Sequence, residues 1–170
     1  MVILKEEINA STAQVIDLAK WKLLAVSAVA VAGLGWSDVK PDDNTSAVVL
    51  LCSIAWLCAY VDLLIYRRLA SLHAVARYLR GYNGDDPETR ELSSYELEVK
   101  KRRDAGEFWI SEELAHFLSS LVFSLSLPAM AYLRYRKDFQ EDFAVIPIIG
   151  LALVITLFFS YNKARHVLLR

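Results

Sequence analysis

Apolar residues along the chain are gathered into four blocks, and stretches dense in charged residues separate them. The blocks cover residues 21–36, 47–66, 109–133 and 143–161. A helical block of about 20 apolar residues matches a bilayer hydrocarbon core of roughly 30 Å. A soluble helical bundle would instead place a charged residue at every third or fourth position. The pattern therefore predicts an all-α integral membrane protein, a four-helix bundle built from two transmembrane hairpins with cytoplasmic helical extensions.

The polar stretches divide the chain into five segments. In residues 1–20, apolar residues recur at helical spacing on one side and polar residues lie toward the other. This amphipathic pattern is typical of a helix lying in the membrane interface. Residues 21–66 form the first predicted hairpin and 67–107 a cytoplasmic helical segment. Residues 108–162 form the second hairpin, and 163–170 are a short basic cytoplasmic tail.

Helix signals refine these boundaries. The helix of the second block keeps its apolar spacing past the membrane, until Gly81 and Pro87 predict a stop near residue 80. A capping box that begins at Ser93 predicts a charged helix over about 94–104. Ser111 is the expected N-cap of the third span, and Pro147 belongs to the first turn of the fourth, which we expect to end near residue 161.

Apolar composition and the placement of positive charge set the membrane orientation. Apolar residues make up 55% of the chain, which is high for a water-soluble protein of this size. All but four of the 19 lysines and arginines lie in the N-terminal arm, the central segment or the C-terminal end. The four exceptions fall in the two short connections between spans: Lys40, Arg134, Arg136 and Lys137. The positive-inside rule then predicts a multi-pass protein of the inner (plasma) membrane with both termini in the cytoplasm.

Asp62 is the only charged residue in the second apolar block. It lies five residues before Arg67, about 7 Å inward from the predicted membrane surface at 1.5 Å per residue. A charged group in hydrocarbon is costly, so Asp62 should face protein or water. We expect an intramembrane ion pair with a lysine at the same depth, and the candidates are Lys20, Lys22 and Lys163. A role in a proton or ion pathway is the alternative.

A polar face runs along the third span. Glu113, His116, Ser120 and Ser124 recur at steps of three and four, so they share one side of a helix over about 16 Å. This face could line an aqueous pore in an oligomer, with His116 able to change charge near neutral pH. It could equally form a hydrogen-bonding seam between helices of one chain.

The first span carries small residues at helical spacing. Ala25, Ala28, Ala32 and Gly35 are three or four positions apart, which predicts a face where another helix can approach closely. We expect this face to support self-association into a homo-oligomer.

No motif in the chain indicates catalysis or a bound cofactor. The three histidines lack metal-ligand spacing, and neither a phosphate-binding glycine loop nor a nucleophile motif is present in the sequence. We therefore expect no enzyme activity, metal or cofactor. The run Lys100, Lys101, Arg102 and Arg103 predicts contact with anionic lipid headgroups, and the acidic residues around it argue against nucleic acid.

Several phrases resemble those of small bacterial four-span membrane proteins: LKEEINAS, WKLLAVSAVAVAGLG, YVDLLIYRRL and FWISEELAHFLSSLVFS. The layout of an amphipathic helix, a tight hairpin and a protruding cytoplasmic helix also resembles the first half of SLATT-type proteins, which occur beside bacterial nucleotide-signalling and antiphage systems. That resemblance implies an oligomeric effector that perturbs or conducts through a membrane. The second hairpin of this chain is a departure from the SLATT pattern.

These features together predict a homo-oligomeric pore-like or channel-like membrane effector, with a role in bacterial antiviral defence implied by the resemblance. Its cytoplasmic helices would sense a partner protein or a nucleotide signal. The alternative is a non-conducting membrane anchor or scaffold that recruits a cytoplasmic partner through residues 67–107. A small transporter is a third class, although four spans would be few unless protomers combine.

Overall fold

All secondary structure in the described part of the chain is helical, which confirms the predicted all-α class. The computed structural model describes residues 2–35, 44–81, 87–104 and 111–169. Five α-helices and a short 3-10 turn follow one another along these residues: α1 (Val2–Gly33), α2 (Asn44–Arg80), α3 (Pro87–Asp104), α4 (Glu112–Arg134), η1 (Glu141–Ala144) and α5 (Val145–Leu169).

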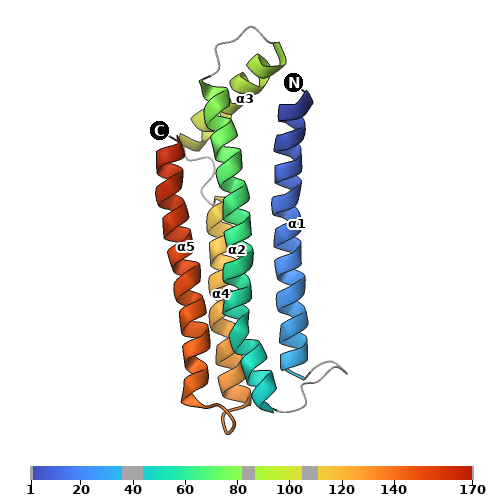
Figure 1. The fold of residues 1–170 in the computed structure, drawn as a ribbon, viewed down its shortest axis with the longest axis vertical. Helices are drawn as coiled ribbons and strands as arrows, with labels where there is room; N and C mark the ends of the chain where they lie inside the picture. The colour runs from blue at the N-terminus through green and yellow to red at the C-terminus, as the bar shows by residue number, and fades with distance from the viewer. Residues whose placement is uncertain (1, 36–43, 82–86, 105–110, 170) are drawn as a thin grey trace.

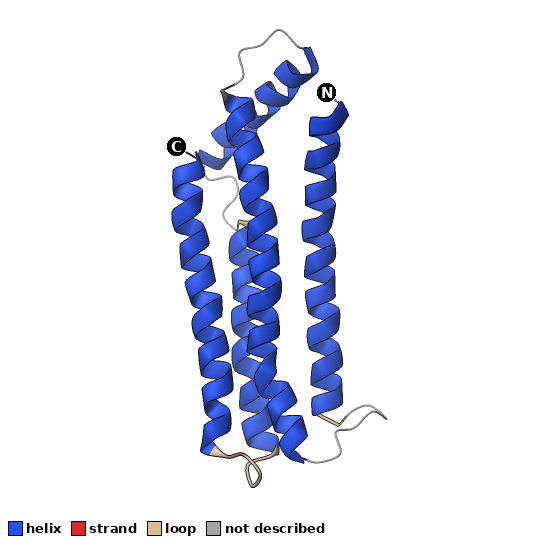
Figure 2. Ribbon diagram, viewed as in Figure 1, coloured by secondary structure: helices blue, strands red, loops and turns tan. Residues whose placement is uncertain are grey.

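The four long helices α1, α2, α4 and α5 lie side by side, and α2 is the central one (Figure 1). Helix α2 packs against α1, α4 and α5, whereas α1 has little contact with α4. The shorter α3 packs on the final turns of α2, at the end of the bundle where α1 begins and α5 ends (Figures 1 and 2). This end is called the α3 end below.

Three of the described helices are long and apolar enough, by length and composition, to cross a membrane. They are α2, α4 and the helical stretch Glu141–Arg165. Helix α1 is long, but charged and polar residues are interspersed among the apolar ones in its first half, and Lys22 interrupts the second half.

Two predicted helix ends and two predicted starts can be compared with the structure. Helix α2 stops at Arg80 as expected, and the Ser111 hydroxyl accepts a hydrogen bond from the Leu114 amide, which confirms the predicted N-cap of α4. The predicted start of α3 near residue 94 is wrong, because the helix begins at Pro87, where the fixed φ of proline suits a first helical turn. Helix α5 also continues to Leu169, through most of the segment predicted as a tail.

Small residues bring α2 close to its neighbours at two points. A Cβ atom added at Gly150 of α5 would lie 2.6 Å from the Ala55 Cβ and 3.0 Å from the Ala55 backbone carbon. A Cβ atom added at Gly33 of α1 would lie 2.7 Å from the Leu51 Cγ. Glycine therefore sets the distance between helices at both contacts.

The small-residue face predicted on the first span is not the face that packs against α2. Ala28 is exposed, Ala25 and Ala32 are half-buried, and Gly35 lies beyond the end of α1 in a turn with φ of +69°. The buried positions of α1 recur at helical spacing on another face: Ser11, Val15, Lys22, Val26 and Gly33. Gly35 lies outside the helix and so does not share this face, and self-association through Ala25, Ala28 and Ala32 stays a prediction.

The interior divides into two apolar clusters along α2. One lies toward the end opposite α3 and joins four helices: Val26, Leu34, Leu51, Ile54, Cys58, Ala59, Leu127, Ala131 and Val154. The other lies toward the α3 end: Val15, Val61, Ile65, Tyr66, Leu69 and Tyr161. Asp62 lies between the two clusters on α2, so both apolar clusters border the site described next.

Candidate functional site: a buried lysine and aspartate on a polar helix face

A lysine and an aspartate meet in the middle of the bundle. Lys22 of α1 is 1% exposed and Asp62 of α2 is 0% exposed, and the Lys22 Nζ lies 3.0 Å from the Asp62 Oδ1. Each charge alone would be costly in an interior of low polarity, so pairing is the condition for burying both. Of the three lysines considered for Asp62, the structure pairs it with Lys22.

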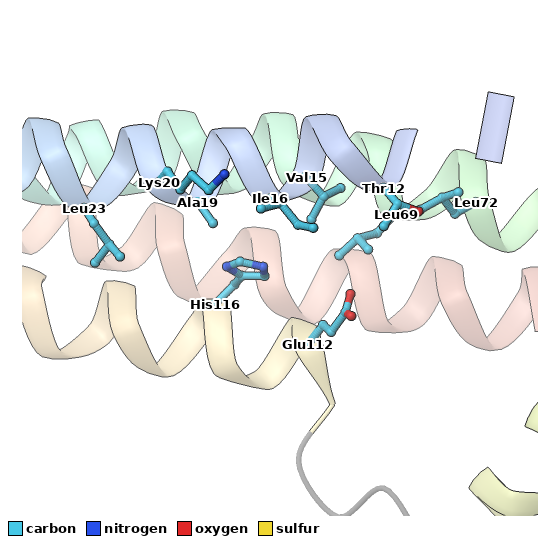
Figure 3. Close-up of a pocket in the computed structure, with 10 residues that line it drawn as sticks. All are labelled: Thr12, Val15, Ile16, Ala19, Lys20, Leu23, Leu69, Leu72, Glu112 and His116. Atoms are coloured by element: carbon cyan, nitrogen blue, oxygen red, sulfur yellow. The ribbon is translucent and has the colours of Figure 1, made fainter. Parts of the chain in front are cut away.

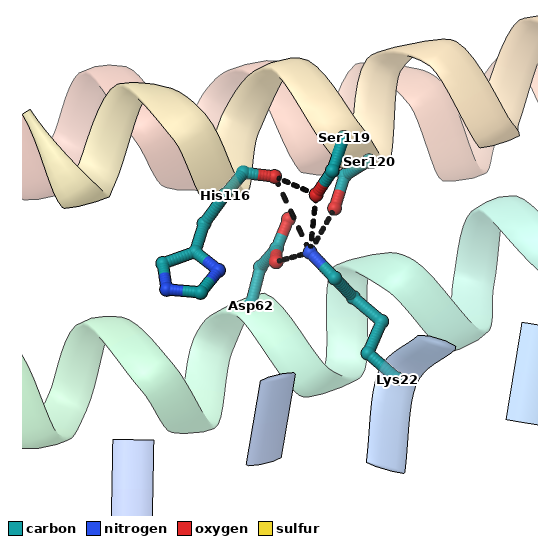
Figure 4. Close-up of polar contacts among 5 residues, drawn as sticks. All are labelled: Lys22, Asp62, His116, Ser119 and Ser120. Atoms are coloured by element: carbon teal, nitrogen blue, oxygen red, sulfur yellow. Dashed lines mark hydrogen bonds and ion pairs between the residues drawn. The ribbon is translucent and has the colours of Figure 1, made fainter. Parts of the chain in front are cut away.

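Helix α4 completes the surroundings of the lysine (Figure 4). The Lys22 Nζ donates to the hydroxyl oxygens of Ser119 and Ser120, each at 2.9 Å, and lies 3.3 Å from the His116 carbonyl oxygen. The Ser119 hydroxyl also donates to that carbonyl, at 2.8 Å. One ammonium group therefore joins α1, α2 and α4 through charge-assisted hydrogen bonds.

Polar atoms around the pair are only partly satisfied. Among the described residues, the Asp62 Oδ2, the Ser124 Oγ and the Tyr66 hydroxyl are buried without a hydrogen-bond partner. An unpaired buried polar atom costs free energy, so these three atoms lower the stability of the folded state.

A second polar cluster lies toward the α3 end. Its centre is Glu113, whose Oε2 lies 3.5 Å from Nη1 of Arg165 and whose Oε1 lies 3.6 Å from Nε2 of His73. The Tyr161 hydroxyl donates to the Glu113 Oε1 at 3.4 Å and lies 2.9 Å from the His73 Nδ1. The Tyr161 ring also stacks on Tyr66, with ring centroids 4.8 Å apart. This cluster ties α2, α4 and α5 together.

The predicted polar face of the third span is directed into the bundle of a single chain. Glu113, Ser120 and Ser124 are buried, and His116 is half-buried at the edge of a groove between α1 and α4. Glu113 and Ser120 bond to neighbouring helices, as the inter-helix alternative expects. Ser124 has no partner among the described residues.

The other residues singled out from the sequence lie outside this site. Lys163 is exposed on α5, and Lys20 forms an exposed pair with Asp17 on α1 at 3.4 Å. Lys100 and Lys101 are exposed on α3, where lipid or protein could reach them. The side chains of Arg102 and Arg103 lie outside the part of the structure that is described.

Some residues that form the polar clusters or the helix contacts are not predicted by any pattern in the sequence. Ser119 falls outside the three- and four-residue spacing of the predicted polar face, and Gly150 is a single glycine in an apolar run, so no sequence pattern predicts either contact. His73 and Tyr161 lie on separate helices. The apolar face of α5 would have placed Tyr161 inward, but no sequence signal predicts its pairing with His73.

Replacing Glu113 tests the second cluster. Glu113→Ala should lower the free energy of unfolding by about 1–3 kcal/mol, because Arg165 and His73 lose their buried anionic partner. Denaturant titration in detergent, followed by circular dichroism, measures this loss. The matched control is Glu112→Ala at the exposed neighbouring position, where a change within about 0.5 kcal/mol is expected. Equal losses in the two variants would contradict the role given to the cluster.

No family model, curated protein or solved structure matches the chain.

Proposed function

We propose that the protein is a multi-pass membrane protein in which α1, α2, α4 and α5 all cross the bilayer. Three of these helices are apolar enough by composition, and α1 runs alongside α2 with its one buried lysine paired. The pairing supports a fourth span, because a neutralised lysine removes the main cost of placing α1 in hydrocarbon. The distribution of lysine and arginine supports an inner-membrane orientation with the α3 end in the cytoplasm.

Within that membrane, the protein serves as a non-conducting anchor that presents a helical platform to a cytoplasmic partner. The platform consists of the end of α2, from Arg67 to Arg80, and of α3. The observation that carries this proposal is that α2 continues past its apolar run and α3 packs on the continuation. Tyr78, Tyr95 and Leu97 are exposed there among charged residues. Aromatic side chains on an exposed polar surface are typical of protein interfaces.

The packing of the opposite half of the bundle supports the non-conducting part of the proposal. Its cluster of large apolar side chains includes Leu51, Ile54, Leu127 and Val154, all of them buried. Among the described residues, these apolar side chains fill this half of the interior and leave an ion no polar path between them. Conduction by one protomer would require these side chains to move apart.

The second candidate is a homo-oligomeric pore-like effector in antiviral defence. Its cytoplasmic helices would sense a partner protein or a nucleotide signal. One observation favours it: polar side chains line one face of α4 from Glu113 to Ser124, over about 16 Å of helix. Since α1 has little contact with α4, assembly could draw α1 aside and turn this face toward water. The buried pair would then act as the lock that holds the closed state.

A flux measurement separates the two candidates. Liposomes that contain the purified protein and an enclosed pH-sensitive dye should stay as tight as empty liposomes after an ion gradient is applied. The variant Asp62→Asn, which weakens the proposed lock, should stay equally tight if the protein is an anchor. Leakage by the wild-type protein, increased in Asp62→Asn, would contradict the anchor and favour the pore.

Site-specific photo-crosslinking tests the platform itself. A photoreactive phenylalanine at Tyr95, which is 65% exposed on α3, should yield adducts of protein size in living cells. The same substitution at Tyr60, which is 62% exposed on the apolar part of α2, is the matched control and should yield none. Protein adducts at Tyr60 but not at Tyr95 would contradict a partner surface at the α3 end.

A further inference from the structure

A groove opens between α1 and α4 (Figure 3), and Leu69 and Leu72 of α2 form its apolar floor. Its volume is about 430 Å³, within the range of roughly 300–1,000 Å³ found for small-molecule sites. Val15, Ile16 and Leu23 of α1 supply an apolar wall. The groove exists because α1 packs against α2 while making little contact with α4.

Charged side chains of both signs border the groove. Lys20 extends along it from α1, and Glu112 and His116 project toward it from α4 (Figure 3). Lys20 also pairs with Asp17, but both side chains are largely exposed, so the lysine can change partner at little cost. A cation and an anion therefore lie on opposite walls above an apolar floor.

Helix pairing places the groove at one level of the bundle. Lys22 contacts Asp62, and Val15 packs in the same cluster as Leu69, so residues 12–23 of α1 run beside residues 61–72 of α2 in the opposite direction. Arg67 and Arg68 lie in the middle of this stretch and end the apolar run of α2. If the protein crosses the membrane as proposed, the groove spans the boundary between headgroups and acyl chains.

We propose that this groove binds one phospholipid whose headgroup carries both a phosphate and a free ammonium. Its acyl chain lies on the apolar floor toward Leu23, Lys20 binds the phosphate, and Glu112 binds the ammonium. The pairing of opposite charges with a two-charge headgroup is the reason to choose this lipid over an anionic one, which Glu112 would repel. The proposal rests on the proposed membrane insertion.

Photo-crosslinking in nanodiscs tests the lipid site. The full chain is placed in bilayers of equal parts phosphatidylethanolamine and phosphatidylglycerol, with a diazirine on the acyl chain of one lipid at a time. Mass spectrometry should find label on residues 12–23 and 69–72, several-fold more from the ethanolamine lipid. Leu72→Trp fills the groove and should remove most of that label, whereas Leu63→Trp, exposed on α2, should leave it unchanged.

Glu112→Gln is a second test variant. Because Glu112 is exposed, the substitution should leave core packing unchanged. It should retain the label in the groove but lose the preference for the ethanolamine lipid. Equal labelling by both lipids in the wild-type protein, or equal labelling of Leu72→Trp and Leu63→Trp, would overturn the proposal. Extraction with alkaline carbonate separates the two failures: release from membranes contradicts the membrane insertion, whereas retention without groove label contradicts the lipid site alone.

Discussion

Lys22→Met should lower the free energy of unfolding by about 3–5 kcal/mol, because it leaves the Asp62 carboxylate buried without its cation. The variant also removes the donor that bonds Ser119 and Ser120, so the α1 contact with α4 weakens as well. Denaturant titration in detergent measures the loss, with helical content followed by circular dichroism. This is the largest single effect that we expect.

The double variant Lys22→Met with Asp62→Leu should recover most of that loss, because replacing a whole buried pair by apolar side chains is often neutral. Lys20→Met is the matched control on the same helix. Its exposed pair with Asp17 should contribute only about 0–1 kcal/mol. A Lys22 variant as stable as the Lys20 variant would show that the pair does not hold the helices together.

Gly150→Leu should lower the free energy of unfolding by about 1–3 kcal/mol, since the added side chain overlaps α2. The first added atom already lies 3.0 Å from the Ala55 backbone carbon and the Trp56 amide nitrogen, and backbone atoms cannot rotate away. The same titration in detergent measures the effect.

Ala152→Leu is the matched control for overpacking, because Ala152 is exposed on the same helix. It adds a comparable side chain without meeting α2 and should leave stability nearly unchanged. Gly33→Ala should cost less than Gly150→Leu, because the atoms it meets belong to the Leu51 side chain. Equal stability of the Gly150→Leu and Ala152→Leu variants would show that α2 and α5 do not need the close approach.

Local signals in the sequence were sufficient for the end of α2 and the start of α4. Ser111 begins α4 because its hydroxyl satisfies a free amide of the first turn, and that rule needs no tertiary information. The start of α3 at Pro87 shows the limit of such signals: both Pro87 and Ser93 suit a helix start, and a choice between them depends on packing against α2. Helix α5 continues past residue 161, and Arg165 in this continuation forms an ion pair with the buried Glu113 of α4. Local sequence signals do not include such a contact.

The buried pair was within reach of sequence reasoning, because an isolated carboxylate in an apolar block requires a cation at the same depth. Depth alone left three lysines as candidates. Choosing Lys22 requires the rotation of α1 about its axis, which depends on where Val26 and Gly33 pack against α2. The same rotation explains why the predicted alanine face does not form the contact with α2. The spacing of the small residues does not predict this rotation.

Membrane insertion and orientation are tested most directly by cysteine labelling in intact cells, in a variant whose buried Cys52 and Cys58 are replaced by alanine. Lys137→Cys, in the connection after α4, should react with a membrane-impermeant maleimide added from outside the cell. Glu91→Cys, exposed on α3, should react only after the cells are opened. Labelling of Glu91→Cys but not Lys137→Cys in intact cells, or recovery of the folded protein in water without detergent, would contradict the proposed arrangement.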